Sequence, residues 1–352
     1  MTRRRPARNA PRPDRARRRA LAGSAGLVAV VVALLGVLGT ATAPPAEALT
    51  VRRVAVDPSS KASVLKAYRD VLLKAEKVPS SWSGAVKGCA VGKEGTASLQ
   101  ATLDAVNYYR AMVQLDPVNL NSTWNTQALR SSLVTAANKK LSHSPSSSSR
   151  CWSSSAATAA GTSNLYLATP SSTTSSSAKV RMPSTGARAV SGYMDDKGTT
   201  NTAVGHRRWI LNPTTREMGS GSTHVSNTLK VFGVKTSTKA AKPRWMEWPP
   251  AGWSPTQIEP AGRWSLSASS SKVSFAKAKV KVVGSSGKAL KVKRYAPKDG
   301  YGPDTLVWDV SLPALPKGSA TAAYKVTVSG ITGTTHTTYS YAVRLFDASA
   351  VS

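Results

Sequence analysis

Cysteine is almost absent from this chain: its 352 residues contain only Cys89 and Cys151. A redox motif or a thiolate metal site needs closer spacing or more thiols than this pair offers, so the pattern favours neither. In an oxidising compartment an even, sparse pair is typical of one structural disulfide. Closing so long a loop is worth about 4 kcal/mol in the chain-entropy model. We therefore expect a Cys89–Cys151 disulfide.

Acidic residues are also scarce, with 17 against 48 lysines and arginines, which gives a formal net charge of +31. A surface this basic attracts polyanions, and outside a cell these are anionic wall polymers or lipid headgroups. The charge is not accompanied by a helix-turn-helix, zinc-finger or stacking-aromatic pattern, which argues against nucleic acid as the partner. The alternative is a solvated lysine coat that keeps the protein soluble.

Long apolar runs are missing from the chain after residue 48. Before it, nine arginines within the first 19 residues precede an uncharged run, Ala20 to Ala46, with the apolar centre "LVAVVVALLGVL". This order predicts an export signal cleaved after Ala48, and hence a secreted, extracellular or wall-associated protein. The alternative is an uncleaved N-terminal membrane anchor, because the run is long enough to span a bilayer. A twin-arginine signal at Arg17 and Arg18 is a weak match in so arginine-rich a segment.

Residues 49–352 are long enough for two domains, keep a net charge of about +24, and contain no expected membrane span. Apolar residues at helical spacing predict helices over 60–77, 98–116 and 126–141. The segment 142–177 is rich in serine, threonine and alanine and predicts a loop around one anchored piece, "NLYLA". A short helix through Tyr193, a packed segment at 209–211 and a strand over 228–235 complete a mixed first domain.

Proline and tryptophan dominate residues 243–264, with five prolines and four tryptophans. This composition predicts a semi-rigid linker whose tryptophans pack against the domains it joins, although a sugar-stacking platform is the alternative. Beyond it, alternating segments such as "AAYKVTVSGI" and "TTYSYAVRLF" predict an immunoglobulin-like β-sandwich that acts as a binding or spacer module. The expected divisions are a signal peptide 1–48, a helical segment 49–96, a first domain 97–242, the linker 243–264 and the sandwich 265–352.

Histidine occurs only four times, and two of the four stand in distinctive surroundings: His143 in "LSHSP" and His206 in "VGHRRWILNP". Together with Asp196, ten residues before His206, they would make a two-nitrogen, one-carboxylate set suited to a zinc-like ion with room for water. Each residue lies on a different predicted element, so their spacing does not test this hypothesis. Surface or helix-cap histidines are the alternative.

Four successive segments resemble the CAP superfamily, also called SCP or cysteine-rich secretory protein, antigen 5 and pathogenesis-related 1 domains. They are "LDAVNYYRAMVQLDPV", "ANKKLSHSP", "SNLYLA" and "VGHRRWILNP" followed by "MGSGST", in the family's order over about residues 97–235. The resemblance implies an α-β-α sandwich with a central cleft. With the C-terminal strands, the expected fold class is α+β.

The resemblance also implies a site, because two histidines and two glutamates face the cleft in that family and can bind a divalent metal. His143 and His206 match the histidines. The first glutamate position is Ser163, which is no carboxylate, and the second corresponds most nearly to Asp196, with Asp195 as a rival. The missing carboxylate puts a divalent metal such as zinc in doubt.

Three functions follow from these observations. The first is a non-catalytic binding protein of the envelope or the extracellular space, whose cleft (His143, His206, Asp196, Ser163) binds a lipid, sterol, glycan or peptide. The second is a hydrolase of envelope or peptide substrates, with a histidine or a metal-bound water in the catalytic role. The third is a structural envelope protein held to anionic polymers by its charge. The arginines beside His206, Arg207 and Arg208, could pair with acids or anionic ligands, but a structural role is the favoured interpretation.

Overall fold

The first predicted helix changes its winding halfway along, in a computed structural model that describes residues 49–168, 185–196, 198–237 and 243–349. An α-helical turn, α1 (Lys61–Ala67), continues as the π-helix η1 (Tyr68–Leu73) and ends as α2 (Lys74–Lys77). Its N-cap is Ser60, whose side chain accepts a hydrogen bond from the backbone of Ser63. The predicted signal and the end of the serine-rich segment lie outside the described residues.

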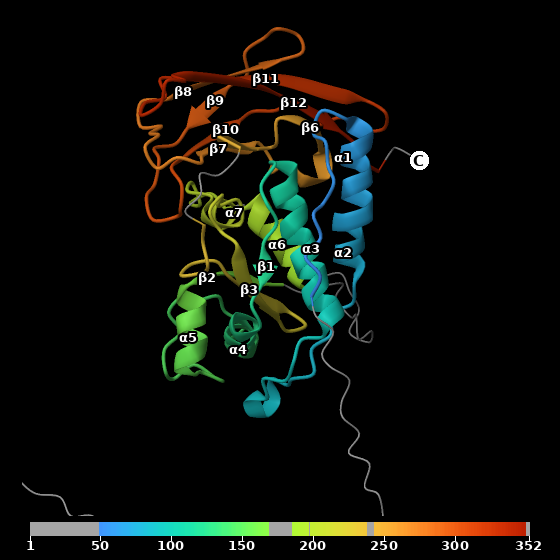
Figure 1. Ribbon diagram of the computed structural model, residues 1–352, viewed down its shortest axis with the longest axis vertical. Helices are drawn as coiled ribbons and strands as arrows, with labels where there is room; N and C mark the ends of the chain where they lie inside the picture. Colours follow the sequence, from blue (N-terminus) through green and yellow to red (C-terminus); the bar gives the residue numbers. More distant parts are fainter. Residues whose placement is uncertain (1–48, 169–184, 197, 238–242, 350–352) are drawn as a thin grey trace, which may run out of the picture. The chain divides into compact units, whose positions relative to one another are not determined.

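A four-stranded sheet forms the centre of the first domain, in the order β1-β3-β4-β2. Its strands are β1 (Asn119–Leu120), β2 (Ser163–Leu167), β3 (Glu217–Ser222) and β4 (Ser226–Lys230). Helices α4 (Ser122–Asn138) and α5 (Ser154–Gly161) contact one face, and α3 (Thr96–Met112) and α6 (Thr185–Asp195) contact the other (Figure 1). The predicted α-β-α sandwich is therefore confirmed.

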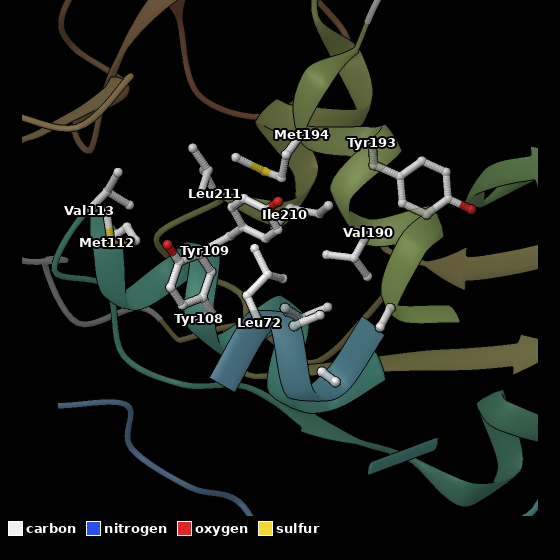
Figure 2. Close-up of a cluster of buried hydrophobic side chains, with 14 of the residues drawn as sticks. Leu72, Tyr108, Tyr109, Met112, Val113, Val190, Tyr193, Met194, Ile210 and Leu211 are labelled. Carbon is white, nitrogen blue, oxygen red and sulfur yellow. The ribbon is translucent and has the colours of Figure 1, made fainter. Parts of the chain in front are cut away.

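Glycines in β3 let α4 approach the sheet closely. A Cβ added at Gly221 would lie 2.1 Å from the backbone nitrogen of Leu129, and one added at Gly219 would lie 2.4 Å from Cβ of Trp124. On the opposite side, aromatic and aliphatic side chains of η1, α3 and α6 interlock (Figure 2). Leu72, Tyr108 and Tyr109 are among the most deeply buried of them. The sheet is thus fixed between two well-packed helical layers.

The segment expected to be a linker instead forms strands of the second domain. Strand β5 (Trp245–Trp248) pairs antiparallel with β7 (Arg263–Ala268), and strand β6 (Gly252–Pro255) pairs in parallel with β12 (Thr338–Phe346). Both β5 and β6 lie at sheet edges, where proline is tolerated because it removes no ladder hydrogen bond. The linker prediction was therefore wrong, and the tryptophans Trp245, Trp248 and Trp264 are buried as packing residues.

Two four-stranded sheets make up the C-terminal β-sandwich, in the orders β5-β7-β10-β9 and β6-β12-β11-β8. The remaining strands are β8 (Lys279–Gly284), β9 (Val292–Arg294), β10 (Thr305–Val310) and β11 (Thr321–Ser329). One apolar core, which includes Trp308, Val326 and Leu345, lies within this domain. The observed combination of helical sandwich and all-β region agrees with the expected α+β class.

The two domains share part of one core, although the sequence predicted two independent cores. Met246, Trp248 and Phe346 come from strands of the sandwich but belong to the cluster built around α3 and α6. The ring of Trp248 contacts that of Tyr109, with centroids 5.5 Å apart. The sandwich therefore packs directly against the first domain and is not joined to it only by a linker. Within the described ranges, no helix has both the length and the apolarity to cross a bilayer.

Candidate functional site

A cleft of about 460 Å³ opens beside the start of β2 and the start of α7 (Gly205–Ile210). His143 and His206 both line it, so residues 63 positions apart in sequence reach one hollow. The other lining residues are Gly161, Thr162, Ser163, Asn164, Asn201, Gly205, Trp209, Val231, Phe232, Gly300 and Tyr301. None of these residues is a lysine, arginine, aspartate or glutamate, so the lining of the cleft is uncharged.

His206 is oriented by a buried carboxylate. Its Nδ1 lies 2.8 Å from Oδ1 of Asp196, whose side chain is almost completely buried. A carboxylate only accepts hydrogen bonds, so Nδ1 carries the proton, and Nε2 of the neutral imidazole is left as an acceptor. The ring of Tyr193 packs against His206 with centroids 5.4 Å apart. The imidazole is therefore held on two sides while its side chain stays 34% exposed.

Asp196 does not reach the cleft itself, because its oxygens are already used. Besides His206, its Oδ1 accepts from Nδ2 of Asn201, and its Oδ2 accepts from the backbone N–H of Arg207 at 3.3 Å. Its left-handed backbone, with φ of 50°, turns the chain directly after α6. Asp196 thus supports the imidazole from behind.

His143 reaches the cleft from a loop rather than from the end of a helix. Helix α4 ends at Asn138, with a left-handed Lys139 as its C-cap, and His143 follows four residues later. Its Nδ1 lies 2.9 Å from the carbonyl oxygen of Ala160. A carbonyl is an acceptor, so this imidazole also donates from Nδ1 and keeps Nε2 as an acceptor.

The predicted disulfide is present and ends the loop that carries His143. The sulfurs of Cys89 and Cys151 are bonded, with the Cα atoms 5.2 Å apart, and the two cysteines are 62 positions apart in sequence. The amide of Asn138 closes the same loop by bonding both backbone polar groups of Arg150. Two independent ties therefore fix where His143 can lie.

The two remaining predicted positions differ in their placement. Ser163 lines the cleft, is 6% exposed, and its Oγ has no hydrogen-bond partner among the described residues. Asp195, the rival of Asp196, lines a separate pocket of about 250 Å³ together with Glu76 and Glu259. The geometry thus favours Asp196 over Asp195 as the carboxylate associated with the histidines.

A divalent metal does not fit the donors that the described residues offer. Among these residues, no group of three or more histidine, cysteine, aspartate or glutamate side chains is placed to hold an ion. The expected set of His143, His206 and Asp196 does not assemble, because the Asp196 carboxylate is engaged behind His206, and Ser163 supplies no charge. Two imidazoles without a carboxylate are a poor site for a dication.

The two arginines of the motif hold the second domain instead of binding acids. Arg207 is 1% exposed, and its guanidinium donates to the carbonyl oxygens of Met194, Asp195 and Arg263 at 2.7–3.0 Å. Burial lowers the pKa of Arg207 to about 10, which leaves the group charged at neutral pH. These contacts agree with the structural role favoured from the sequence rather than with an acidic or anionic partner, because backbone carbonyls occupy the guanidinium.

Arg208 fixes a loop of the sandwich against the cleft. Its guanidinium donates to the carbonyl oxygens of Lys298 and Pro303 at 2.7 and 2.8 Å and lies over the ring of Tyr301. That ring in turn covers Gly205, where an added Cβ would lie 2.6 Å from Cδ1 of Tyr301. Sequence reasoning missed Tyr301 and Phe232, because no local pattern marks them as cleft residues.

Comparison with known proteins identifies the first domain. Residues 103–235 match the model of the Cysteine-rich secretory protein family, CAP. The matched range contains both histidines, Asp196 and Ser163, but not the sandwich that supplies Tyr301. No curated protein matches the chain. With its α-β-α layers and its two-histidine cleft, this part of the chain belongs to the CAP family.

Proposed function

We propose that this chain is a secreted, non-catalytic binding protein whose CAP cleft holds an uncharged ligand at the cell envelope. The observation that carries the proposal is the lining of the cleft: two imidazoles and no lysine, arginine, aspartate or glutamate, in a chain of net charge +31. Desolvating a charge in such a cleft is costly without a partner, so the lining selects against ionic ligands. The export signal rests on residues 1–48, and the disulfide fits an oxidising compartment.

The same observation narrows the expected ligands. A lipid, sterol, glycan or peptide remains chemically compatible where its bound part is neutral, whereas an anionic wall polymer or headgroup does not suit this cleft. Such polymers would instead meet the lysine-rich exterior. The proposal therefore separates the cleft ligand from any polyanion that holds the protein at the envelope.

Native mass spectrometry of residues 49–352, purified from the host, tests the proposal. We expect wild type to retain a neutral molecule of defined mass, and the His143→Leu, His206→Leu double variant to lose it while keeping its circular dichroism spectrum. A His336→Leu variant is the matched control, because His336 is exposed in a loop of the sandwich. Equal retention by the double variant, or no retained molecule in wild type, would contradict the proposal.

A hydrolase is the second candidate, favoured by the pairing of His206 with a buried carboxylate. Such a pair holds an imidazole as a general base in many enzymes. However, the Oγ of Ser163 is not hydrogen-bonded to either imidazole, so Ser163 does not form a serine triad with them. Hydrolysis of envelope or peptide substrates that disappears in His143→Ala and His206→Ala variants would favour this candidate over binding alone.

A further inference from the structure

The hydrogen-bonding groups left unused around the cleft are mainly acceptors. In its neutral form each imidazole keeps Nε2 as an acceptor, because its Nδ1 already donates. Asn201 directs its amide nitrogen to Asp196, which leaves its Oδ1 without a partner among the described residues. Ser163 adds one hydroxyl. The cleft therefore suits a neutral ligand that carries several hydrogen-bond donors.

Three aromatic rings flank these acceptors. The rings of Trp209 and Phe232 meet edge to face, with centroids 5.5 Å apart, and Tyr301 lines the cleft as well. Phe232 is 55% exposed and Tyr301 39% exposed, although rings of this size are usually buried. By contrast, Trp245, Trp248 and Trp264 are buried in the domain cores. Of the three exposed aromatic rings among the described residues, Phe232 and Tyr301 thus line the cleft, where a ligand can cover them, whereas Trp152 lies outside it.

Apolar ring faces beside hydrogen-bond acceptors that can pair with hydroxyl groups suit a saccharide best. A sugar ring presents C–H faces that pack on aromatic rings and hydroxyls that donate or accept as the site requires. A peptide backbone carries as many carbonyl acceptors as N–H donors, and an acyl chain carries no donors, so each leaves polar groups in the cleft or on the ligand unpaired.

We infer that the cleft binds an uncharged saccharide and that Tyr301, supplied by the β-sandwich, forms one wall of this site. The inference rests on the proposed function and specifies its ligand class. Tyr301 lies 95 residues beyond His206 in sequence and is held in place by the contacts of Arg208 with its loop. The β-sandwich thereby contributes to the ligand specificity of the cleft in addition to presenting the CAP domain.

Titration calorimetry with the β-1,4-linked tetramer of N-acetylglucosamine, a neutral probe, tests the inference. We expect Tyr301→Ala and Phe232→Ala each to weaken binding about tenfold, the upper range for one aromatic contact. Tyr301→Phe keeps the ring and is expected to bind within about twofold of wild type. Tyr295→Ala is the control, because Tyr295 precedes the same loop but does not line the cleft.

A second variant distinguishes the contribution of the Tyr301 ring to binding from its contribution to the stability of its loop. Gly205→Ala places a methyl group against the Tyr301 ring without deleting any ring. It should therefore weaken binding of the sugar tetramer while the sandwich stays folded. Unchanged affinity in Tyr301→Ala and Gly205→Ala would overturn the role of Tyr301. A lipid or peptide retained in native mass spectrometry, with no binding of the tetramer, would overturn the saccharide inference but leave the proposed function standing.

Discussion

Two surfaces of this molecule handle charge in opposite ways. The cleft of the CAP domain is lined without a single ionisable acid or a lysine or arginine, although the chain carries +31. The outward face of β8, β11 and β12, here called the basic face, exposes Lys279, Lys281, Lys325 and Arg344, and these strands contain no acidic residue. The contrast shows that net charge and ligand recognition are located on different parts of the protein. Charge-based association therefore says little about what the cleft binds.

The largest expected effect comes from removing the contacts of Arg207, which join the CAP domain to the β-sandwich. Arg207→Met would leave the carbonyl oxygens of Met194, Asp195 and Arg263 buried without a donor. We expect a loss of about 5 kcal/mol in the free energy of unfolding, measured by chemical denaturation. Arg344→Met on the basic face is the control and should change it by less than about 0.5 kcal/mol. Equal effects of the two variants would refute the role given to Arg207.

Removing the disulfide should loosen the cleft without touching the basic face. The double variant Cys89→Ser, Cys151→Ser is expected to lose about 4 kcal/mol of stability, because the tie spans 62 residues. Its binding of the neutral tetramer should weaken, since the tie ends the loop that carries His143. Retention on a polyanion column should stay the same. If the variant lost retention on the column but kept its affinity for the tetramer, the disulfide would support the basic face rather than the cleft, which would contradict this account.

A smaller, pH-dependent effect is expected from Glu94, which is half-buried and accepts hydrogen bonds from Ser98 and Ser222. Burial raises its pKa from 4.5 to about 7, so the folded state binds this proton more tightly than the unfolded state. Stability from this group is complete below pH 4.5 and is lost as pH rises to about 7, by about 3 kcal/mol in total. Denaturation of wild type and Glu94→Gln across this range should show that slope only in wild type.

Neutralising the basic face should have the smallest effect on the fold. Replacing Lys279, Lys281, Lys325 and Arg344 by glutamine is expected to change stability by less than about 1 kcal/mol in total. It should lower the salt concentration that elutes the protein from immobilised polyphosphate, because exposed charges act through a screened field. Four glutamines on other exposed lysines, at positions 87, 93, 139 and 140, are the matched control. An equal shift in that control would mean that total charge, rather than this face, sets retention.

Periodicity in the sequence located the long helices and most C-terminal strands, because burial of one face imposes a repeat on the order of apolar and polar residues. The short helix α5 was missed inside a serine-rich stretch, although its alanines and the capping Ser153 are good helix signals. The strands β5 and β6 were missed because the prolines in and around them suggest a break, and only the sheet order shows them to be edges.

The site was only partly accessible from the sequence. Family resemblance placed His143 and His206 together, and the cleft contains both. The wall made by Tyr301 could not be foreseen, because it depends on how two domains pack, and neither "KDGYGP" nor its spacing from His206 carries a signal. A structural role was favoured for Arg207 and Arg208, but their partners could not be predicted, because these are carbonyl oxygens of distant segments, which side-chain chemistry does not reveal.

An NMR titration of residues 49–352 with the neutral tetramer tests the central claim most directly, because one experiment reports on both surfaces. We predict that the signals of His143, His206 and Tyr301 shift with a common dissociation constant that does not change between about 50 and 500 mM salt. Lys325 and Arg344 should not respond. Shifts confined to the basic face, or an affinity that collapses with added salt, would contradict the account.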